Sequence, residues 1–200
     1  MISTENVEKI HESQDDIESL FQSWEKQTHR NLSDYKFHVY RVWNLCLKLS
    51  GLNESTDAEL FRLLAITSAF HDSEYFINKN WDYLNTSNQK MTEYLKSVKL
   101  DHITEIASLC LFNHHLLIIY RGPHFRIVES FRKADLIDFP GWRLHGIDKQ
   151  YLRKLRKVFP YENFRFIVWF ETFKQFTKSP FSGLPMLKKT PYLISDEEIK

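Results

Sequence analysis

Residues 60–76 read LFRLLAITSAFHDSEYF, and the spacing of their apolar side chains indicates the fold class of the chain. An apolar stripe follows the three- and four-residue steps of one helix face and consists of Leu60, Leu63, Leu64 and Thr67. His71 closes the same stripe, and Asp72 follows it directly. The pattern therefore predicts a helix over 56–70 that directs an imidazole and a neighbouring carboxylate toward the interior.

Three other predicted helices carry a polar side chain on an apolar face in the same way. His38 begins a stripe that continues through Val42, Leu45 and Leu49. His114 ends a stripe made of Ile103, Ile106, Ala107, Cys110 and Leu111. Asp135 shares a face with Val128 and Phe131, and Asp138 follows one turn later. Four separate helices thus direct an imidazole or a carboxylate toward one interior.

These four polar positions have two interpretations. Taken singly, a histidine on an apolar helix face is more often a structural residue with satisfied hydrogen bonds than a ligand. Taken together, the imidazoles and carboxylates form the mixed nitrogen and oxygen set that divalent transition metals favour. Because neutral imidazole supplies nitrogen and the carboxylates offset the charge of the cation, we expect a divalent metal site where the helices meet.

The rest of the sequence predicts an all-α protein, a compact bundle of about seven helices. Only 5 Gly are present and the 6 Pro lie mostly late in the chain, so frequent turns between strands are not expected. The predicted helices cover 4–26, 33–49, 56–70, 87–98, 102–114, 125–139, 148–158 and 162–177. Gly51 is the expected C-cap of the second, a capping box of Thr56 with Glu59 starts the third, and Asp101 is the expected N-cap before 102–114. Residues 73–87 stay unassigned, and 116–123 are expected to form a loop.

Length and charge narrow the class of protein. We expect a single domain, with an N-terminal helix in 1–29, a helical core in 30–178 and a C-terminal arm in 179–200. The 27 Lys and Arg nearly balance the 26 Asp and Glu, which argues against a binder of nucleic-acid polymers or of a membrane surface. No run approaches the ~20 apolar residues of a membrane span, and no export signal is visible, so a cytoplasmic protein is expected. The two cysteines lack the CxxC spacing of a zinc finger.

Three segments together resemble a known family. His38 begins HVYRVW, His71 and Asp72 lie in AFHDSEYF, and Asp135 lies in FRKADLIDF. Their order and helix placement look like the H…HD…D signature of the HD superfamily of metal-dependent phosphohydrolases, over about residues 30–140. The resemblance implies an HD-domain helical bundle in which these four residues bind one divalent metal. It also implies that Asp72 bridges to a second ion where one is present.

The resemblance bears on the second ion as well. His114 and His115, in LFNHHLL, are similar to the paired histidines with which binuclear HD branches, such as the HD-GYP phosphodiesterases, bind a second metal. Those branches add a further histidine between the HD doublet and the pair, and here the only candidate is His102. On a continuous helix His102 would lie about 18 Å from His114, so we do not expect it to be a ligand. One ion is expected and a second is left open, as is the choice among Mn, Fe, Co, Mg and Zn.

The activity that the resemblance implies is hydrolysis of a small phosphomonoester or nucleotide by a metal-activated water. Glu74 is the expected proton-transfer residue, because HD nucleotidases often carry an acidic residue shortly after the doublet. Arg41, three residues after His38, is expected to support the ligands. Lys133 is expected to neutralise phosphate charge, although most lysines are simply exposed; the other candidate cations are Arg132, Arg121, Arg126 and Lys79.

Two alternatives stay open at this point. Some HD-fold proteins are di-iron oxygenases, which need six ligands, and the sequence offers six: His38, His71, Asp72, His114, His115 and Asp135. The other alternative is a non-catalytic protein that binds a metal or a nucleotide. In the hydrolase reading the partner is a small phosphorylated substrate. The aromatic-rich segment 162–177 suits either a core helix or an interface between copies of the chain, so the oligomeric state is left open.

Overall fold

The computed structural model describes residues 9–138 and 146–161, together with the single positions 166, 170 and 177. These residues form helices and connecting loops and contain no strand, which confirms the predicted all-α class. The helices are α1 (Asp15–Thr28), α2 (Ser33–Ser50), α3 (Ala58–Phe70), α4 (Ser73–Asn78), α5 (Leu84–Ser97), α6 (Thr104–Asn113), α7 (Phe125–Asp138) and α8 (Lys149–Val158), with one 3₁₀ turn, η2 (Asp101–Ile103), before α6.

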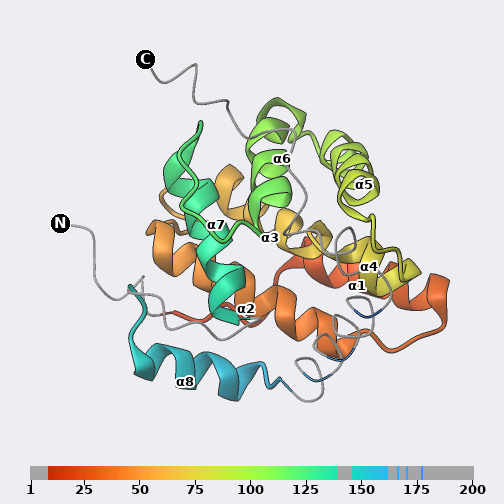
Figure 1. Cartoon of the computed structure of the whole chain (residues 1–200), viewed down its shortest axis with the longest axis horizontal. Coiled ribbons are helices and arrows are strands. Elements are labelled where there is room, and N and C mark those ends of the chain that lie inside the picture. Colours follow the sequence, from red (N-terminus) through yellow and green to blue (C-terminus); the bar gives the residue numbers. More distant parts are fainter. Residues whose placement is uncertain (1–8, 139–145, 162–165, 167–169, 171–176, 178–200) are drawn as a thin grey trace.

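The bundle is organised around α2. Its most extensive contacts are with α7 and then with α3, while α6 packs against α7, α5 and α3. Figure 1 shows α7 crossing in front of α2, with α6 beside it and α8 at the lower edge of the molecule. The largest fully buried side chain is Trp43, which lies on α2. Each of the four helices α2, α3, α6 and α7, which carry the polar positions of the sequence analysis, thus packs against two of the others.

The start of the first helix differs from the sequence prediction. Residues 9–14 are not helical, α1 begins at Asp15, and the side chain of Gln14 caps it by accepting from the backbone of Ile17. The preceding chain is held against α2 by side chains instead: the backbone N–H of His11 donates to Asn44 at 2.8 Å, and the N–H of Gln14 donates to the Tyr40 hydroxyl at 3.0 Å. These tertiary bonds replace helical ones. Residues 4–8 of the predicted helix lie outside the described residues.

The predicted capping box of Thr56 and Glu59 is wrong by one position. The N-cap of α3 is Asp57, whose carboxylate accepts from the backbone N–H of Leu60 at 2.9 Å. Thr56 instead takes part in a turn, where its hydroxyl donates to the carbonyl of Asn53 at 2.9 Å. The predicted C-cap of α2 is confirmed, because Gly51 has the left-handed φ of 67° that ends a helix at low cost.

Two further differences concern short elements. The unassigned stretch 73–87 contains α4 and the start of α5, and Asp101 opens η2 rather than capping α6 directly. Loop 116–124 is non-helical, as predicted for 116–123.

Nearly all of the predicted helix 162–177 and all of the arm 179–200 lie outside the described residues. Within the described part of the chain, no helix combines the length and apolarity needed to cross a bilayer.

Candidate metal centre

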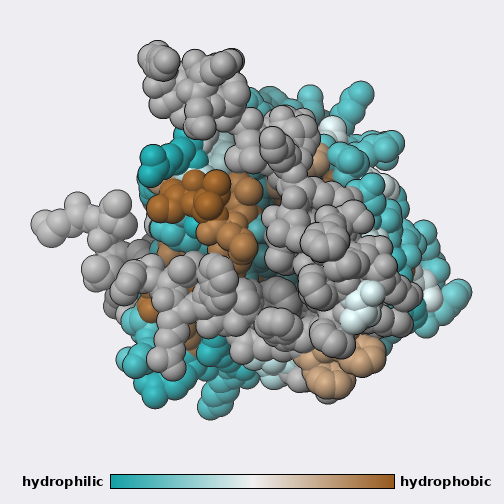
Figure 2. Space-filling model, in the orientation of Figure 1, coloured by the Kyte–Doolittle hydropathy of each residue, from teal (hydrophilic) through white to brown (hydrophobic). Residues whose placement is uncertain are grey.

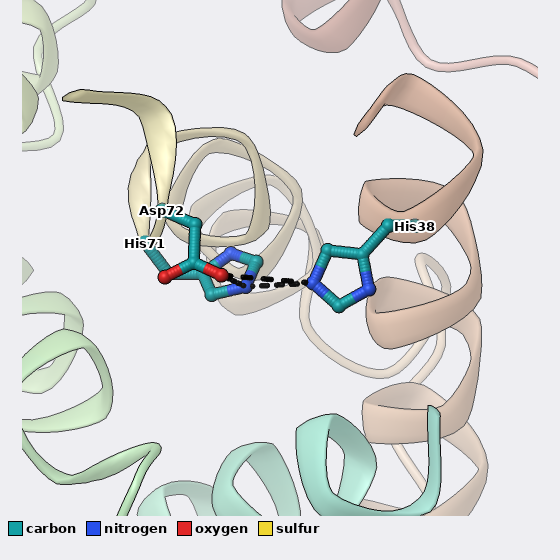
Figure 3. A group of neighbouring side chains, drawn as sticks. All are labelled: His38, His71 and Asp72. Atoms are coloured by element: carbon teal, nitrogen blue, oxygen red, sulfur yellow. Dashed lines mark hydrogen bonds and ion pairs between the residues drawn. The ribbon is translucent and has the colours of Figure 1, made fainter. Parts of the chain in front are cut away.

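The polar residues predicted to face the interior meet at one point of the bundle. His38 lies in the middle of α2, His71 directly follows α3, Asp72 is the N-cap of α4, and Asp135 lies near the end of α7. His114 directly follows α6, and His115 comes next. Figure 3 shows the ring of His71 and the carboxylate of Asp72 facing one nitrogen of His38 across the gap between the helices.

Three of these histidines are fixed in the same orientation by protein acceptors. The Nδ1 atom lies 2.7 Å from Asp138 Oδ2 in His38, 2.7 Å from the Ser68 carbonyl in His71 and 2.6 Å from the Leu111 carbonyl in His114. Because a carbonyl or an ionised carboxylate can only accept, each Nδ1 carries the proton and donates. The Nε2 atoms of all three rings therefore point into the centre, as those of metal-binding imidazoles do, and each carries a lone pair whenever its ring holds a single proton.

The first group of ligand atoms surrounds the two facing imidazoles. His38 Nε2 and His71 Nε2 are 3.1 Å apart. Asp135 Oδ1 lies 3.6 Å from the first and 3.8 Å from the second. Asp72 Oδ2 lies 4.0 Å from His38 Nε2 and 3.5 Å from His71 Nε2. At 3.1 Å the two Nε2 atoms are within hydrogen-bond distance, so either a shared proton or a bound cation would relieve the repulsion between their lone pairs.

The second group shares a residue with the first. Asp72 directs its other oxygen, Oδ1, toward His114 Nε2 at 3.3 Å and toward His115 Nε2 at 3.9 Å. The two oxygens of Asp135 also face different groups: Oδ1 faces the first group, and Oδ2 lies 3.9 Å from His115 Nδ1. Neither Asp72 Oδ1 nor His114 Nε2 has another hydrogen-bonding partner among the described residues. Asp72 thus lies between two clusters, each of which could hold a metal ion.

The spacing of these atoms fits a small divalent cation. Metal–nitrogen and metal–oxygen bonds of about 2.1 Å place neighbouring ligand atoms about 3 to 3.5 Å apart in tetrahedral or octahedral geometry. The separations in the first group run from 3.1 to 4.0 Å, so small side-chain adjustments would bring the four atoms onto one ion. Imidazole nitrogen with carboxylate oxygen suits Mn, Fe, Co and Zn better than it suits Ca.

Burial shifts the pKa values of the ligands in a way that agrees with this chemistry. Burial lowers the pKa of His71 to about 3, so the ring is neutral and its lone pair is available. Burial also raises the pKa of Asp135 to about 6, with help from the nearby Asp72 and Asp138 charges. The pKa of His114 is raised because the Asp72 carboxylate outweighs burial. The Asp72 carboxylate therefore favours positive charge beside His114, whether a proton or a metal ion carries it.

Asp138 is bonded directly to a candidate ligand, a contact that the sequence analysis did not predict. Its Oδ2 accepts from His38 Nδ1, and its Oδ1 accepts from Arg41 Nε at 2.7 Å. Burial opposes its ionisation, but Arg41 and His38 hold its pKa far below the ordinary value. The sequence placed Asp138 one turn beyond Asp135 without a role. The signal that could have found it is the matching one-turn step from His38 to Arg41 on α2.

Arg41 lies behind the centre rather than in it. Besides its bond to Asp138, its Nη1 donates to the carbonyls of Phe159 at 3.1 Å and Pro160 at 2.8 Å, and the ring of Tyr161 covers the guanidinium at 4.1 Å. Arg41 is fully buried. Arg41 is connected to the candidate ligand His38 through Asp138, which suits the supporting role expected from the sequence.

Tyr83 is a second residue that the sequence did not single out. It is the N-cap residue of α5 and is buried, and its hydroxyl is hydrogen-bonded to His115 Nε2. Burial and the negative charge of Asp72 raise the pKa of Tyr83 well above its ordinary value, so the phenol is protonated. Residues 73–87 gave no periodic signal, and an aromatic in such a stretch could not be assigned to the site.

The other expected catalytic residues lie in ion pairs. Both carboxylate oxygens of Glu74 are occupied, one by Lys90 Nζ at 2.6 Å and the other by Asn78 Nδ2 at 2.7 Å. Lys133 is partly exposed and lies 3.6 Å from Glu129. The partners of both side chains thus lie outside the candidate ligand set, and their catalytic roles stay predictions. His102 pairs with Glu59 at the surface, away from the clusters that could hold a metal.

An apolar loop continues from the histidine pair. Its ends are fixed to α7, because Arg132 donates to the Leu116 carbonyl at 2.7 Å and Glu129 accepts from the Tyr120 N–H at 3.0 Å. Figure 2 shows an apolar area on this face, near the position of α6 and α7 in Figure 1. The large apolar side chains exposed in this stretch are Leu117, Ile118, Ile119 and Phe125.

The geometry therefore identifies a helical protein with two buried histidine and aspartate clusters that could hold a metal ion and that share Asp72. The chain was also compared with protein-family models, with curated proteins and with solved structures, and none of them matches it.

Proposed function

We propose that the chain belongs to the HD superfamily and is a metal-dependent phosphohydrolase that acts on a small phosphomonoester or nucleotide. The observation that carries the proposal is the arrangement of Asp72, whose two oxygens face different pairs of imidazoles. A purely structural carboxylate would be expected to accept hydrogen bonds from donors. Here one oxygen faces His71, whose Nδ1 already carries the ring proton.

The chemistry of a divalent ion at this centre would be to activate water near neutral pH and to polarise a phosphoryl oxygen. The chain's own residues prepare the centre for that role. Asp138 and the Ser68 and Leu111 carbonyls hold three imidazoles with Nε2 inward, so little side-chain entropy is lost on binding. Asp72 and Asp135 supply negative charge that would offset the cation.

Access to the centre comes from the side of His115 and Asp72. Their side chains are 18% and 14% exposed, whereas those of His38, His71 and His114 are at most 1% exposed. A phosphate group approaching from this side would reach the oxygens shared between the two clusters first. The low exposure of the centre also favours a small substrate, because so little exposed surface suits a terminal phosphate rather than the backbone of a polymer.

One observation favours a second candidate. The six residues His38, His71, Asp72, His114, His115 and Asp135 form one continuous set of contacts, which is the ligand number that a di-iron oxygenase of this fold requires. The two candidates differ in cofactor and co-substrate: the hydrolase needs a divalent ion and water, while the oxygenase needs two irons and oxygen.

An activity screen separates these candidates. The protein is freed of metal with a chelator, reloaded anaerobically with Mn²⁺, Co²⁺, Zn²⁺ or Fe²⁺, and assayed for phosphate release from phosphomonoesters and nucleotides. We expect metal-dependent phosphate release that needs no oxygen and is abolished in His71→Ala but retained in His102→Ala, the matched control at the exposed histidine. Oxygen consumption by an iron-loaded protein without phosphate release would favour the oxygenase. Neither activity, with metal bound, would favour a binding protein.

A further inference from the structure

His115 differs from the other three histidines of the centre in how its ring is held. His38, His71 and His114 bind protein acceptors through Nδ1 and direct Nε2 inward. In His115 the nitrogen nearest to Asp72 Oδ1 is Nε2, at 3.9 Å, and that same atom is hydrogen-bonded to the Tyr83 hydroxyl. Its Nδ1 lies 3.9 Å from Asp135 Oδ2, which is beyond hydrogen-bond distance.

This hydrogen bond competes directly with metal binding. If Tyr83 donates, the lone pair of Nε2 is already used; if Nε2 carries the proton and donates, it has no lone pair to offer. In either tautomer an ion that uses Nε2 of His115 must first break the bond to Tyr83. In the first cluster the Nε2 atoms of His38 and His71 lie 3.1 Å from each other and face the two carboxylates, while both Nδ1 atoms are bonded to protein acceptors.

We propose that Tyr83 controls the second cation position, by holding Nε2 of His115 in a hydrogen bond that a second ion has to break. The proposal rests on the metal centre of the proposed function. It makes the two positions unequal: the cluster of His38, His71, Asp72 and Asp135 fills first, and the cluster of Asp72, His114 and His115 fills only at higher metal concentration.

The surroundings of Tyr83 suit this role. Its side chain is buried at the start of α5, and the edge of its ring meets the ring of His115 at an interplanar angle of 89°. The ring of Tyr75 packs beside it at 6.2 Å between centroids. A phenol held on two sides in this way keeps its hydroxyl at His115.

The test is a Zn²⁺ titration of the full-length chain, followed by calorimetry and by elemental analysis after desalting. It compares the wild type with Tyr83→Phe and with Tyr94→Phe, a control whose lost hydroxyl bonds Asp16 at 2.9 Å instead. We expect the first ion to bind equally in all three proteins. The second ion should bind about tenfold more tightly to Tyr83→Phe than to wild type, the change expected when one competing hydrogen bond is lost. A second ion bound by Tyr83→Phe no more tightly than by wild type, or bound by neither, would overturn the proposal.

A measurement on the wild-type protein keeps the proposal testable if Tyr83→Phe does not fold. Long-range ¹H–¹⁵N spectra report the protonation and ligation of each imidazole nitrogen. At one equivalent of Zn²⁺ we expect the Nε2 resonances of His38 and His71 to move while that of His115 keeps its zinc-free position. Movement of His115 Nε2 together with the others would contradict the proposal. A wild type that binds no Zn²⁺ at all would remove the metal centre itself, a failure distinct from unchanged second-ion affinity in Tyr83→Phe.

Discussion

His38 Nδ1 donates to Asp138 Oδ2 at 2.7 Å, and the other oxygen of the same carboxylate accepts from Arg41 at 2.7 Å. The three side chains form a buried chain that begins at the candidate metal ligand and ends at a guanidinium covered by Tyr161. Because the carboxylate fixes both the tautomer and the rotation of the imidazole, Asp138 would orient His38 for the proposed ion without binding the ion itself.

Replacement of Asp138 by Asn tests this relationship. The amide can still accept one hydrogen bond, but it leaves the buried Arg41 charge without its carboxylate and weakens the hold on His38. We expect metal affinity to fall about 10- to 100-fold, and the free energy of unfolding to fall by about 3 kcal/mol. Zn²⁺ titration and urea denaturation measure the two effects, with Asp101→Asn at the surface as control. Unchanged metal affinity in a folded Asp138→Asn protein would show that Asp138 has only a structural role.

Glu74 offers a test of catalytic against structural roles. Its carboxylate is 4% exposed and is engaged by Lys90 and Asn78, so we expect Glu74→Gln to reduce stability by about 1 to 3 kcal/mol through loss of a charge-assisted hydrogen bond. The same change in a Lys90→Met background should cost less, because the partner charge is already gone. Urea denaturation of the four proteins gives this coupling energy. Full stability with phosphate release reduced by more than about a hundredfold, the scale of lost general acid–base catalysis, would instead assign Glu74 the proton-transfer role.

Ionised Asp16 should stabilise the folded protein at neutral pH, and this stabilisation should be lost in acid. Burial opposes ionisation of this carboxylate, but hydrogen bonds from Arg62, Gln14 and Tyr94 outweigh it, so its pKa in the folded protein lies below the ordinary value of 3.8. A depressed folded pKa adds stability above the unfolded pKa, and this stability is lost as pH falls through the folded value. We therefore expect wild type to be more stable than Arg62→Met at pH 7.

The same comparison at low pH completes the test. The stability advantage of wild type over Arg62→Met should shrink below about pH 4, where the unfolded carboxyl begins to bind a proton. Urea denaturation at pH 7, 5, 4 and 3 measures it, and an advantage that stays constant or grows at pH 3 would contradict the assignment. The Arg62 side chain is 41% exposed, so added salt should also reduce the difference.

Helical periodicity explains why much of the site could be predicted. His38, His71 and Asp135 each continue an apolar stripe, and a stripe must face the core whichever way the helices pack. The joint burial of these residues with His114 therefore followed from the sequence, although their distances did not. The resemblance to a known signature supplied the expectation of a metal, and the geometry is consistent with it.

What the sequence could not predict depends on contacts between distant segments. The bond from Tyr40 to Gln14, and those between Asn44 and His11, keep residues 9–14 out of helix α1, and no local propensity reports them. The catalytic role expected for Glu74 was inferred from its position two residues after Asp72 in the sequence. In the structure its carboxylate accepts from Lys90 on α5 instead of facing the candidate ligands. Tyr83 lies 32 residues from His115 in a segment without periodicity, so the packing of α5 against α6 brings the two together.

The most direct test of the metal centre is the metal content of the purified protein, compared between wild type, Asp72→Ala and Asp101→Ala. Asp72 is shared by both clusters, so its loss should remove ligands from each, while Asp101 is an exposed aspartate with no place in either. We predict about one divalent ion per chain in wild type and Asp101→Ala, after saturation and desalting, and almost none in a folded Asp72→Ala protein. Equal metal content in all three proteins, or no bound metal in wild type, would contradict the account.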